Sequence, residues 1–542
     1  MKKLLYSALV IAFTFSAIRC SESYLDEESY GPTVAVFETE EGSESLVHLL
    51  YKKLNVYGGT FSLGFMTENG ADTWLRGKNA AGTPVTDYLG LDANSADVAW
   101  YWNHFYKALW NCNLFLETYP DMVYSDPKVK EGRKGEVLTL QAFFLWHVTE
   151  QWGDTYLPKS TDVEEGLRAE RSTREDFYNR IIANLEEAIT ILPPKTNELG
   201  RVDQGVAKAL LTRIYLYHGD WQKAADMAED VIKNHGYALE PSWTALWDET
   251  KKVNKEFIWT AEFSDDDAFG AGGSWYWQAY AMHIDRFAGV KTELGYTGFG
   301  GCQIMPSKYY ISLFNQEADL RWSQGHQWAW LYNDPADDTS VFPEMKTLYS
   351  DTALYLYTGV LTAGQRAAVA HKYTVFDMND MYDAAGVPKD RGTFIGLTKF
   401  DDQTRPSDLS NISARNYPII RLGEIYLIAA EAQLRLGAAG TAAQYINDLR
   451  ARVITPGHEA EMTVSDADMS IDFILDERGR ELGGEFQRWY DLKRTGKLLE
   501  RVRAYNPDAA PNIQDHHLVR PIPQPQFDGM PDPETLGQNP EY

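Results

Sequence analysis

Aromatic side chains beside charged ones are the residues of this sequence best suited to binding chemistry. Asp72, Trp74 and Arg76 lie together in the polar segment GADTWLRGKN, which spans residues 70–79. A flat indole stacks against the apolar face of a ring, while a neighbouring carboxylate and guanidinium hydrogen-bond to hydroxyl groups. The segment therefore predicts contact with a hydroxyl-rich ligand, and ordinary burial in the core remains the alternative for each side chain.

Further candidates lie in aromatic stretches outside the expected helix interiors. Trp100 falls near the start of a predicted helix, where its ring would face a cleft. Trp275, Tyr276 and Trp277 follow the glycine-rich run GAGG, and Tyr296 lies in a second glycine-rich loop. The sequence holds 16 Trp, 32 Tyr and 23 Phe, so most aromatic rings must pack in the interior. We expect two or three of the candidates to contact a ligand.

No catalytic motif accompanies these aromatic residues. The sequence contains no P-loop, no G-x-S-x-G elbow and no H-E-x-x-H motif, and its glycine clusters lack dinucleotide-site spacing. The histidines at 516–517 and the acidic runs at 265–267 and 337–338 lack metal-ligand spacing. We therefore predict no catalytic residues, no metal and no cofactor. A secreted glycoside hydrolase remains an alternative, because sequence spacing cannot reveal two carboxylates about 5–10 Å apart.

The N-terminus reads as an export signal that ends in a lipid-attachment site. Lys2 and Lys3 precede an apolar run over residues 4–18, which is too short to span a membrane. A cysteine at the end of such a run predicts acylation of Cys20 after removal of residues 1–19. An ordinary signal peptide is the alternative, since Arg19 stands where small residues are usual. No other apolar stretch approaches spanning length, so residues 20–542 are expected to be anchored to a membrane without crossing it.

Charge and cysteine content narrow the possible partners. Lys and Arg total 51 against 78 Asp and Glu, which gives a net charge of −27. An acidic surface repels phosphate backbones, so nucleic acid is excluded as an expected partner. Two further cysteines, Cys112 and Cys302, form a disulfide in an oxidising compartment or remain free and buried, and both alternatives stay open.

Apolar spacing predicts a mainly helical chain. Helices are expected over residues 45–54, 98–116, 137–152 and 172–192, the last with a capping box of Ser172 and Glu175. Residues 205–218 with 221–234, and 421–436 with 441–453, each read as two antiparallel helices with small residues at their contacts. Pairs of about 34 residues are typical of tetratricopeptide repeats.

The middle of the chain has a different character. Residues 257–263 (FIWTAEF) are strand-like, and residues 264–415 are rich in Gly, Asp, Trp and Tyr with few helical patterns. Disordered segments usually lack aromatic residues. We therefore predict an ordered, loop-rich and partly β lobe over about 264–415, carried on the helical scaffold.

Several specific motifs follow one another near the C-terminus. They read RLGEIYLIAAEA (421–432), INDLRAR (446–452), ILDERGREL (474–482), RWYDLKR (488–494), PIP (521–523) and QNP (538–540). Less specific motifs are Trp102 with Tyr106 and Asn113, then QWGD (151–154) and DLR (319–321). In this order they resemble the motifs of one family, the SusD/RagB nutrient-binding lipoproteins. Their charged residues lie on apolar helices, so we expect them to pair and lock the scaffold; Glu477 and Glu481 are read as partners of Arg478 and Arg480.

The resemblance implies the fold, the partners and the location. The fold would be mainly α, a tetratricopeptide-like superhelix of four helix pairs with a variable, loop-rich lobe. The protein would cap a TonB-dependent SusC-like transporter at the outer membrane and bind an oligosaccharide or polysaccharide without hydrolysing it. Some relatives handle peptides, which leaves a peptide ligand as an alternative. Acidic residues at 22 and 26–28 resemble the surface-export signals of Bacteroidetes lipoproteins.

Overall fold

Helices dominate the structure, as predicted. The computed structural model describes residues 34–80, 84–264, 266, 273–294, 300–334, 351–407, 410 and 412–542. It is about 51% helical, and its strands form only small sheets. The predicted mainly α, tetratricopeptide-like scaffold with a loop-rich, partly β lobe is confirmed.

The elements follow in three groups. Before the lobe, the helices are η2 (Val34–Glu38), α2 (Glu40–Lys52), η3 (Lys53–Val56), α3 (Ser62–Gly64), the π-helical turn η4 (Phe65–Asn69), α4 (Pro84–Asp87), α5 (Ala96–Thr118), η5 (Tyr119–Asp121), α6 (Pro127–Trp152), α7 (Val163–Leu167), α8 (Arg174–Ile191), α9 (Gln204–His218), α10 (Trp221–Asn234) and α11 (Trp243–Leu246). Within and after the lobe, they are η7 (Tyr276–Gln278), α12 (Lys308–Ser312), α13 (Leu320–Gly325), α14 (Ala363–Val369), α15 (Met378–Met381), α16 (Leu422–Arg435), α17 (Ala439–Arg450), η8 (Ala451–Val453), α18 (Glu459–Met462), η9 (Asp466–Asp468), α19 (Ile471–Leu482), α20 (Arg488–Arg494), α21 (Leu498–Tyr505), η10 (Asp515–Leu518), α22 (Gln524–Asp528) and η11 (Pro533–Thr535). The strands are β1 (Trp74–Arg76), β2 (Thr155–Tyr156), β3 (Arg171–Ser172), β4 (Phe257–Ala261), β5 (Ile304–Pro306), β6 (His326–Gln327), β7 (Ala329–Leu331), β8 (Thr352–Leu356), β9 (Thr374–Phe376), β10 (Gly396–Leu397) and β11 (Tyr417–Arg421).

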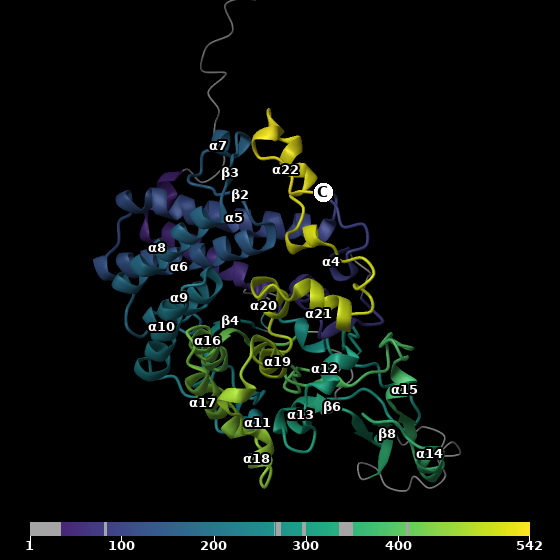
Figure 1. The fold of residues 1–542 in the computed structure, drawn as a ribbon. Helices are drawn as coiled ribbons and strands as arrows, with labels where there is room; N and C mark the ends of the chain where they lie inside the picture. The colour runs from purple at the N-terminus through teal and green to yellow at the C-terminus, as the bar shows by residue number, and fades with distance from the viewer. Residues whose placement is uncertain are drawn as a thin grey trace, which may run out of the picture.

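The scaffold is a stack of helices in which each packs on the next. The order of contact runs α5, α6, α8, α9, α10, α16 and α17, and Figure 1 shows the first five gathered at one side of the molecule with α16 and α17 below them. Small side chains allow this close approach: Ala224, Ala225 and Ala228 of α10 are buried, as is Ala432 of α16. Both predicted helix pairs are therefore present; their bounds lie within two residues of those expected, except that α17 ends at Arg450, three residues early, where η8 continues to Val453.

The lobe interrupts the stack between α10 and α16, which pack directly together although the middle of the chain separates them. β4 and β11 pair antiparallel at the point where the chain leaves and returns, with Tyr417 opposite Ala261. The strand predicted at 257–263 is thus present as β4. In Figure 1 the lobe projects from the lower right of the stack, around α12 to α15 and β6 to β8.

The cap of α8 differs from the prediction by one residue. The capping box is formed by Thr173 and Asp176, whereas Ser172 and Glu175 were expected to form it. Thr173 Oγ1 accepts the Asp176 N–H, and the Asp176 carboxylate accepts the Thr173 N–H. Ser172 cannot serve because it lies in β3, which pairs with β2. Because the strand β3 ends at Ser172, the helix α8 is capped one residue later, at Thr173.

A two-stranded sheet joins the N-terminal part to the lobe. β1 and β5 pair antiparallel, with Trp74 opposite Pro306 and Arg76 opposite Ile304. This pairing carries residues 77–80 to the lobe, where the Asn79 N–H donates to the carbonyl of Cys302 at 3.0 Å.

Cys302 and Cys112 are both free and buried, so the disulfide alternative is wrong. None of the helices within the described residues is long and apolar enough to cross a membrane.

Candidate functional site

Three predicted ligand residues are sealed in the interior, and these predictions are wrong. Trp74 is 0% exposed, and its ring lies 4.7 Å from Tyr280 and 4.3 Å from Tyr310, centroid to centroid. Tyr276 is likewise 0% exposed, and its hydroxyl lies 2.7 Å from that of Tyr280. Because β1 pairs with β5, the lobe supplies rings that cover Trp74.

Asp72, the third buried residue, pairs with two arginines of the scaffold. Its carboxylate receives Arg488 Nε at 2.6 Å and Arg501 Nη1 at 3.3 Å. Burial raises the pKa of Asp72, but the two guanidinium groups outweigh it and hold the pKa below its usual value. Asp72 therefore ties the N-terminal part to α20 and α21 and offers nothing to a ligand.

The other predicted site residues differ in how far they are exposed, and two of them lie outside the described residues. Trp277 is 5% exposed and lies under the guanidinium of Arg405, 3.6 Å from ring centroid to Cζ, so one face of its ring is already covered. Arg76 is half-buried at the end of β1. Tyr296 and Cys20 lie outside the described residues.

Among the predicted rings that the structure describes, Trp100 and Trp275 remain exposed, at 42% and 41%. Both flank the connection formed by residues 53–61. Trp100 stacks on His104 at 5.1 Å, and His104 Nε2 bonds to the carbonyl of Lys53 at 2.9 Å. The Trp275 N–H donates to the carbonyl of Gly58 at 3.1 Å. Burial lowers the pKa of His104 to about 4, so its ring is neutral at physiological pH.

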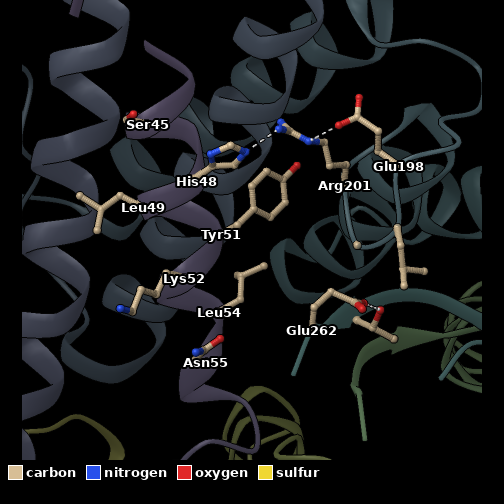
Figure 2. A pocket seen from close by; sticks show the side chains of 13 residues that line it. Ser45, His48, Leu49, Tyr51, Lys52, Leu54, Asn55, Glu198, Arg201 and Glu262 are labelled. Atoms are coloured by element: carbon tan, nitrogen blue, oxygen red, sulfur yellow. Dashed lines mark hydrogen bonds and ion pairs between the residues drawn. The ribbon is translucent and has the colours of Figure 1, made fainter. Parts of the chain in front are cut away.

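A cavity of about 590 Å³ opens beside this connection (Figure 2). It lies between α2, the turn at 198–201 and the end of β4, and we call it the α2 cavity. Its lining residues are Ser45, His48, Leu49, Tyr51, Lys52, Leu54, Asn55, Glu198, Leu199, Gly200, Arg201, Thr260 and Glu262. Lys52, Leu54 and Asn55 lead directly into the connection, so the cavity adjoins the segment that Trp100 reaches through His104 and that Trp275 contacts at Gly58.

The ring of Tyr51 forms the centre of the α2 cavity. Figure 2 shows it between the His48–Arg201 pair and Glu262. The Tyr51 hydroxyl donates to Glu136 at 2.5 Å and accepts the Val202 N–H at 2.9 Å, which fixes the ring. Arg201 donates to His48 Nε2 at 3.0 Å. A held ring amid donors and acceptors suits a ligand that has apolar faces and hydroxyl groups.

Glu262 adds a carboxyl group to the opposite wall. Burial raises its pKa, while hydrogen bonds from Thr260 Oγ1 and Asn416 Nδ2 act in the other direction. A carboxyl group held in this way accepts hydrogen bonds from ligand hydroxyls. Sequence inspection missed Tyr51, His48, Arg201 and Glu262, because their spacing along the chain carries no motif.

A smaller polar cluster lies where β1 leads into the lobe. Arg286 Nη2 pairs with Asp390 at 2.7 Å, and the side chain of Lys78 lies beside Gly392. Asn79 Nδ2 donates to the carbonyl of Gly300 at 3.1 Å. A Cβ at Gly300 would meet the His283 ring at 1.4 Å, so a larger residue there would have to displace that ring. The N-terminal stretch and the lobe thus meet in a partly exposed, mixed-charge cluster.

The motif charges lie inside the scaffold, as predicted. Glu481 receives Arg421 at 2.7 Å, Arg321 at 3.0 Å and Arg452 at 2.6 Å. Glu477 pairs with Arg480 at 2.7 Å, whereas Arg478 pairs with Asp491 at 2.5 Å and not with a glutamate of its own helix. The expected partner of Arg478 was wrong, because α20 brings Asp491 closer.

Within the described ranges, no three His, Cys, Asp or Glu side chains gather as a metal site.

These features define a class: a tetratricopeptide-like helical-repeat protein with an inserted lobe and a polar cavity at its first long helix. The chain belongs to the SusD family. The model described as SusD family matches residues 255–542, and one described as starch-binding associating with outer membrane matches residues 24–216. The family is a carbohydrate-binding group and not an enzymatic one. The predicted family resemblance is confirmed.

Relatives match over most of their length. A SusD-like protein of Formosa agariphila is 24% identical over 95% of each chain, and the starch-binding protein SusD of Bacteroides thetaiotaomicron is 25% identical over 71% of this chain and 67% of its own. Among solved structures, a laminarin-binding SusD-like protein has a TM-score of 0.69 at 21% identity, covering 93% of this chain and all of that one. Surface glycan-binding protein A of Bacteroides thetaiotaomicron, in complex with laminarihexaose, has a TM-score of 0.68 at 20% identity, covering 92% of this chain and 99% of its own. These structural matches support the fold.

Proposed function

We propose that this protein binds an oligosaccharide or polysaccharide at the cell surface and delivers it, uncleaved, to a SusC-like TonB-dependent transporter. The observation that carries the proposal is the pair of exposed tryptophans, Trp100 and Trp275, beside the polar α2 cavity. Membership of a carbohydrate-binding family supports the ligand class, and two solved proteins of the same fold are named for laminarin or glycan binding.

The chemistry of the site favours sugars. A pyranose has an apolar face for an indole and hydroxyl groups that pair with charged and amide side chains. Trp100 and Trp275 offer two rings, and the α2 cavity adds Tyr51, Arg201 and Glu262. We place the ligand along the connection at 53–61, with one end in the cavity.

We expect the double variant Trp100→Ala with Trp275→Ala to weaken glycan binding by about tenfold or more, because each lost stacking contact removes roughly 0.5–1.5 kcal/mol. The measurement is calorimetry on residues 20–542 carrying Cys20→Ser, against a panel of oligosaccharides and peptides. Both rings are surface groups, so the melting temperature should change little.

Leu436→Ala is the matched control. Leu436 is 40% exposed and lies at the end of α16, so its loss removes similar apolar surface without an aromatic ring. Glycan affinity and stoichiometry that are both unchanged in the double variant would refute the placement of the ligand. Binding of peptides but not glycans would establish the peptide alternative, and release of reducing ends would establish the hydrolase alternative.

We propose that residues 1–19 are a signal peptide, that residues 20–542 are the mature chain, that residues 264–415 are its variable lobe, and that Cys20 carries the lipid anchor to the outer membrane. Cys20→Ala is expected to move the protein from the membrane fraction to the soluble fraction, because acylation needs the thiol. Immunoblotting of both fractions measures this. Ser21→Ala is the control and should stay with the membrane; retention of Cys20→Ala there would contradict the anchor.

A further inference from the structure

A second concave site lies along α5, on the C-terminal side of Trp100. It has a volume of about 360 Å³ and is formed by α5, the loop at 156–167 and α22, and Figure 1 shows α7 and α22 close together at the upper end of the molecule. We call it the α5–α22 cleft. Its lining residues are Trp102, Asn103, Tyr106, Trp110, Tyr156, Pro158, Ser160, Thr161, Asp162, Val163, Gly166, Leu167, Pro525, Gln526, Gly529 and Met530. Its volume lies in the range of about 300–1,000 Å³ that is usual for ligand sites.

Stacked aromatic rings form the base of this cleft. Trp102 and Tyr106 stack at 4.2 Å with 30° between their planes. Tyr106 and Tyr156 are nearly parallel, at 3° and a centroid distance of 6.0 Å. Trp110, one turn further along α5, is 46% exposed although it lies in a cleft. An exposed indole in a cleft that partly buried rings also line offers a flat apolar face on which a ligand ring can stack.

The loop that forms one wall is rigidly held. Glu117 accepts hydrogen bonds from the Thr161 N–H at 2.8 Å and from its hydroxyl at 2.5 Å. Asn113 Nδ2 donates to the Ser160 carbonyl at 3.1 Å. A wall fixed before binding lowers the ordering cost that a ligand must meet.

Amide groups surround the platform. Gln526 Oε1 accepts the Trp102 indole N–H at 3.3 Å, which orients the side-chain amide with its nitrogen as a donor. The Asn103 side chain is exposed at the rim. Among the described residues that line the cleft, none is Lys or Arg. The site therefore suits a neutral ring with hydroxyl groups and not a phosphate or sulfate.

We propose that the α5–α22 cleft is a second binding site, which takes a neutral pyranose ring stacked on Trp110 with its hydroxyls bonded by Asn103 and Gln526. The ligand class rests on the proposed function; the site itself rests on the cleft. Two separated sites on one chain would hold a long polysaccharide more tightly than either site alone.

The test compares four forms of residues 20–542 carrying Cys20→Ser: the parent, Trp110→Ala, Trp100→Ala with Trp275→Ala, and the triple variant. Each is titrated calorimetrically with the shortest oligosaccharide bound by the parent. We expect two oligosaccharides per parent chain, one per chain for Trp110→Ala and for the double variant, and none for the triple variant. Asn103→Ala should weaken the same site, and Asn111→Ala, elsewhere on α5, is its matched control.

The outcomes separate this inference from the proposed function. Stoichiometry and affinity unchanged by Trp110→Ala and by Asn103→Ala would overturn the second site, even if the double variant loses binding. Loss of binding only through Trp110→Ala would support the cleft and overturn the placement at Trp100 and Trp275. No binding of any neutral glycan by the parent would overturn both.

Discussion

Replacing Arg421 by alanine is expected to destabilise the folded protein by about 3–5 kcal/mol, because it leaves buried carboxylates without their cation. Arg421 is 1% exposed and pairs with Glu485 at 2.8 Å, Glu256 at 2.9 Å and Glu481 at 2.7 Å. These partners come from the segment before β4 and from the region of α19. The residue therefore joins the base of the lobe to the C-terminal scaffold. Urea unfolding of the parent and the variant measures the difference.

Two controls identify the cause of this loss. Arg421→Lys keeps the charge but not the planar fork, so its destabilisation should lie between those of the parent and Arg421→Ala. Arg168→Ala breaks an exposed pair with Glu164 at 3.7 Å and should change the stability by about 0.5 kcal/mol or less. If Arg421→Ala costs no more than Arg168→Ala, the buried network does not stabilise the scaffold.

Replacing Glu68 by glutamine is expected to stabilise the protein increasingly as the pH rises. Glu68 lies in the π-helical turn η4 and is 1% exposed. Burial raises its pKa to about 8, against partial opposition from Arg488. That arginine is already paired with Asp72, so it compensates the burial of Glu68 only in part.

The direction in which Glu68 changes the stability with pH follows from when the folded and unfolded chains release its proton. The unfolded chain releases the Glu68 proton at its ordinary pKa of 4.5, whereas the folded chain keeps it until the pH passes about 8. The stability supplied by Glu68 is therefore complete below pH 4.5 and is lost as the pH rises through about 8. Glutamine remains neutral throughout, so the gain over the parent should grow to about 5 kcal/mol at about pH 9.

Unfolding curves at several pH values test this expectation. The difference between Glu68→Gln and the parent should be small in mild acid and should increase across the neutral range. Glu534→Gln, at an exposed position, provides the control and should show no such trend. A difference that stays constant with pH would mean that Glu68 is ionised in the folded protein.

The scaffold could be predicted because its signals are local. Apolar residues at helical spacing and alanines at the contacts predicted the two helix pairs, and both form as α9 with α10 and α16 with α17. Charged residues on apolar helices predicted pairing, since an unpaired buried charge is too costly. Even the one-residue error at α8 has a local cause, because Ser172 belongs to β3 and Thr173 became the cap.

The ligand surface could not be predicted in the same way. Trp74 and Trp275 both follow or lie within glycine-rich polar segments, and sequence alone treats them alike. Trp74 is covered by Tyr280 and Tyr310, which the pairing of β1 with β5 brings from the lobe. The Trp275 N–H donates to the carbonyl of Gly58, and its side chain stays 41% exposed.

The sequence by itself therefore determined the helix pairs, because their apolar spacing is local, and it showed which charged residues must find partners, because an unpaired buried charge is too costly. Only the tertiary structure decided which aromatic rings face solvent and where a cavity opens. Exposure is set by segments far apart in the chain: α2, the turn at 198–201 and the end of β4 create the α2 cavity only when the stack brings them together.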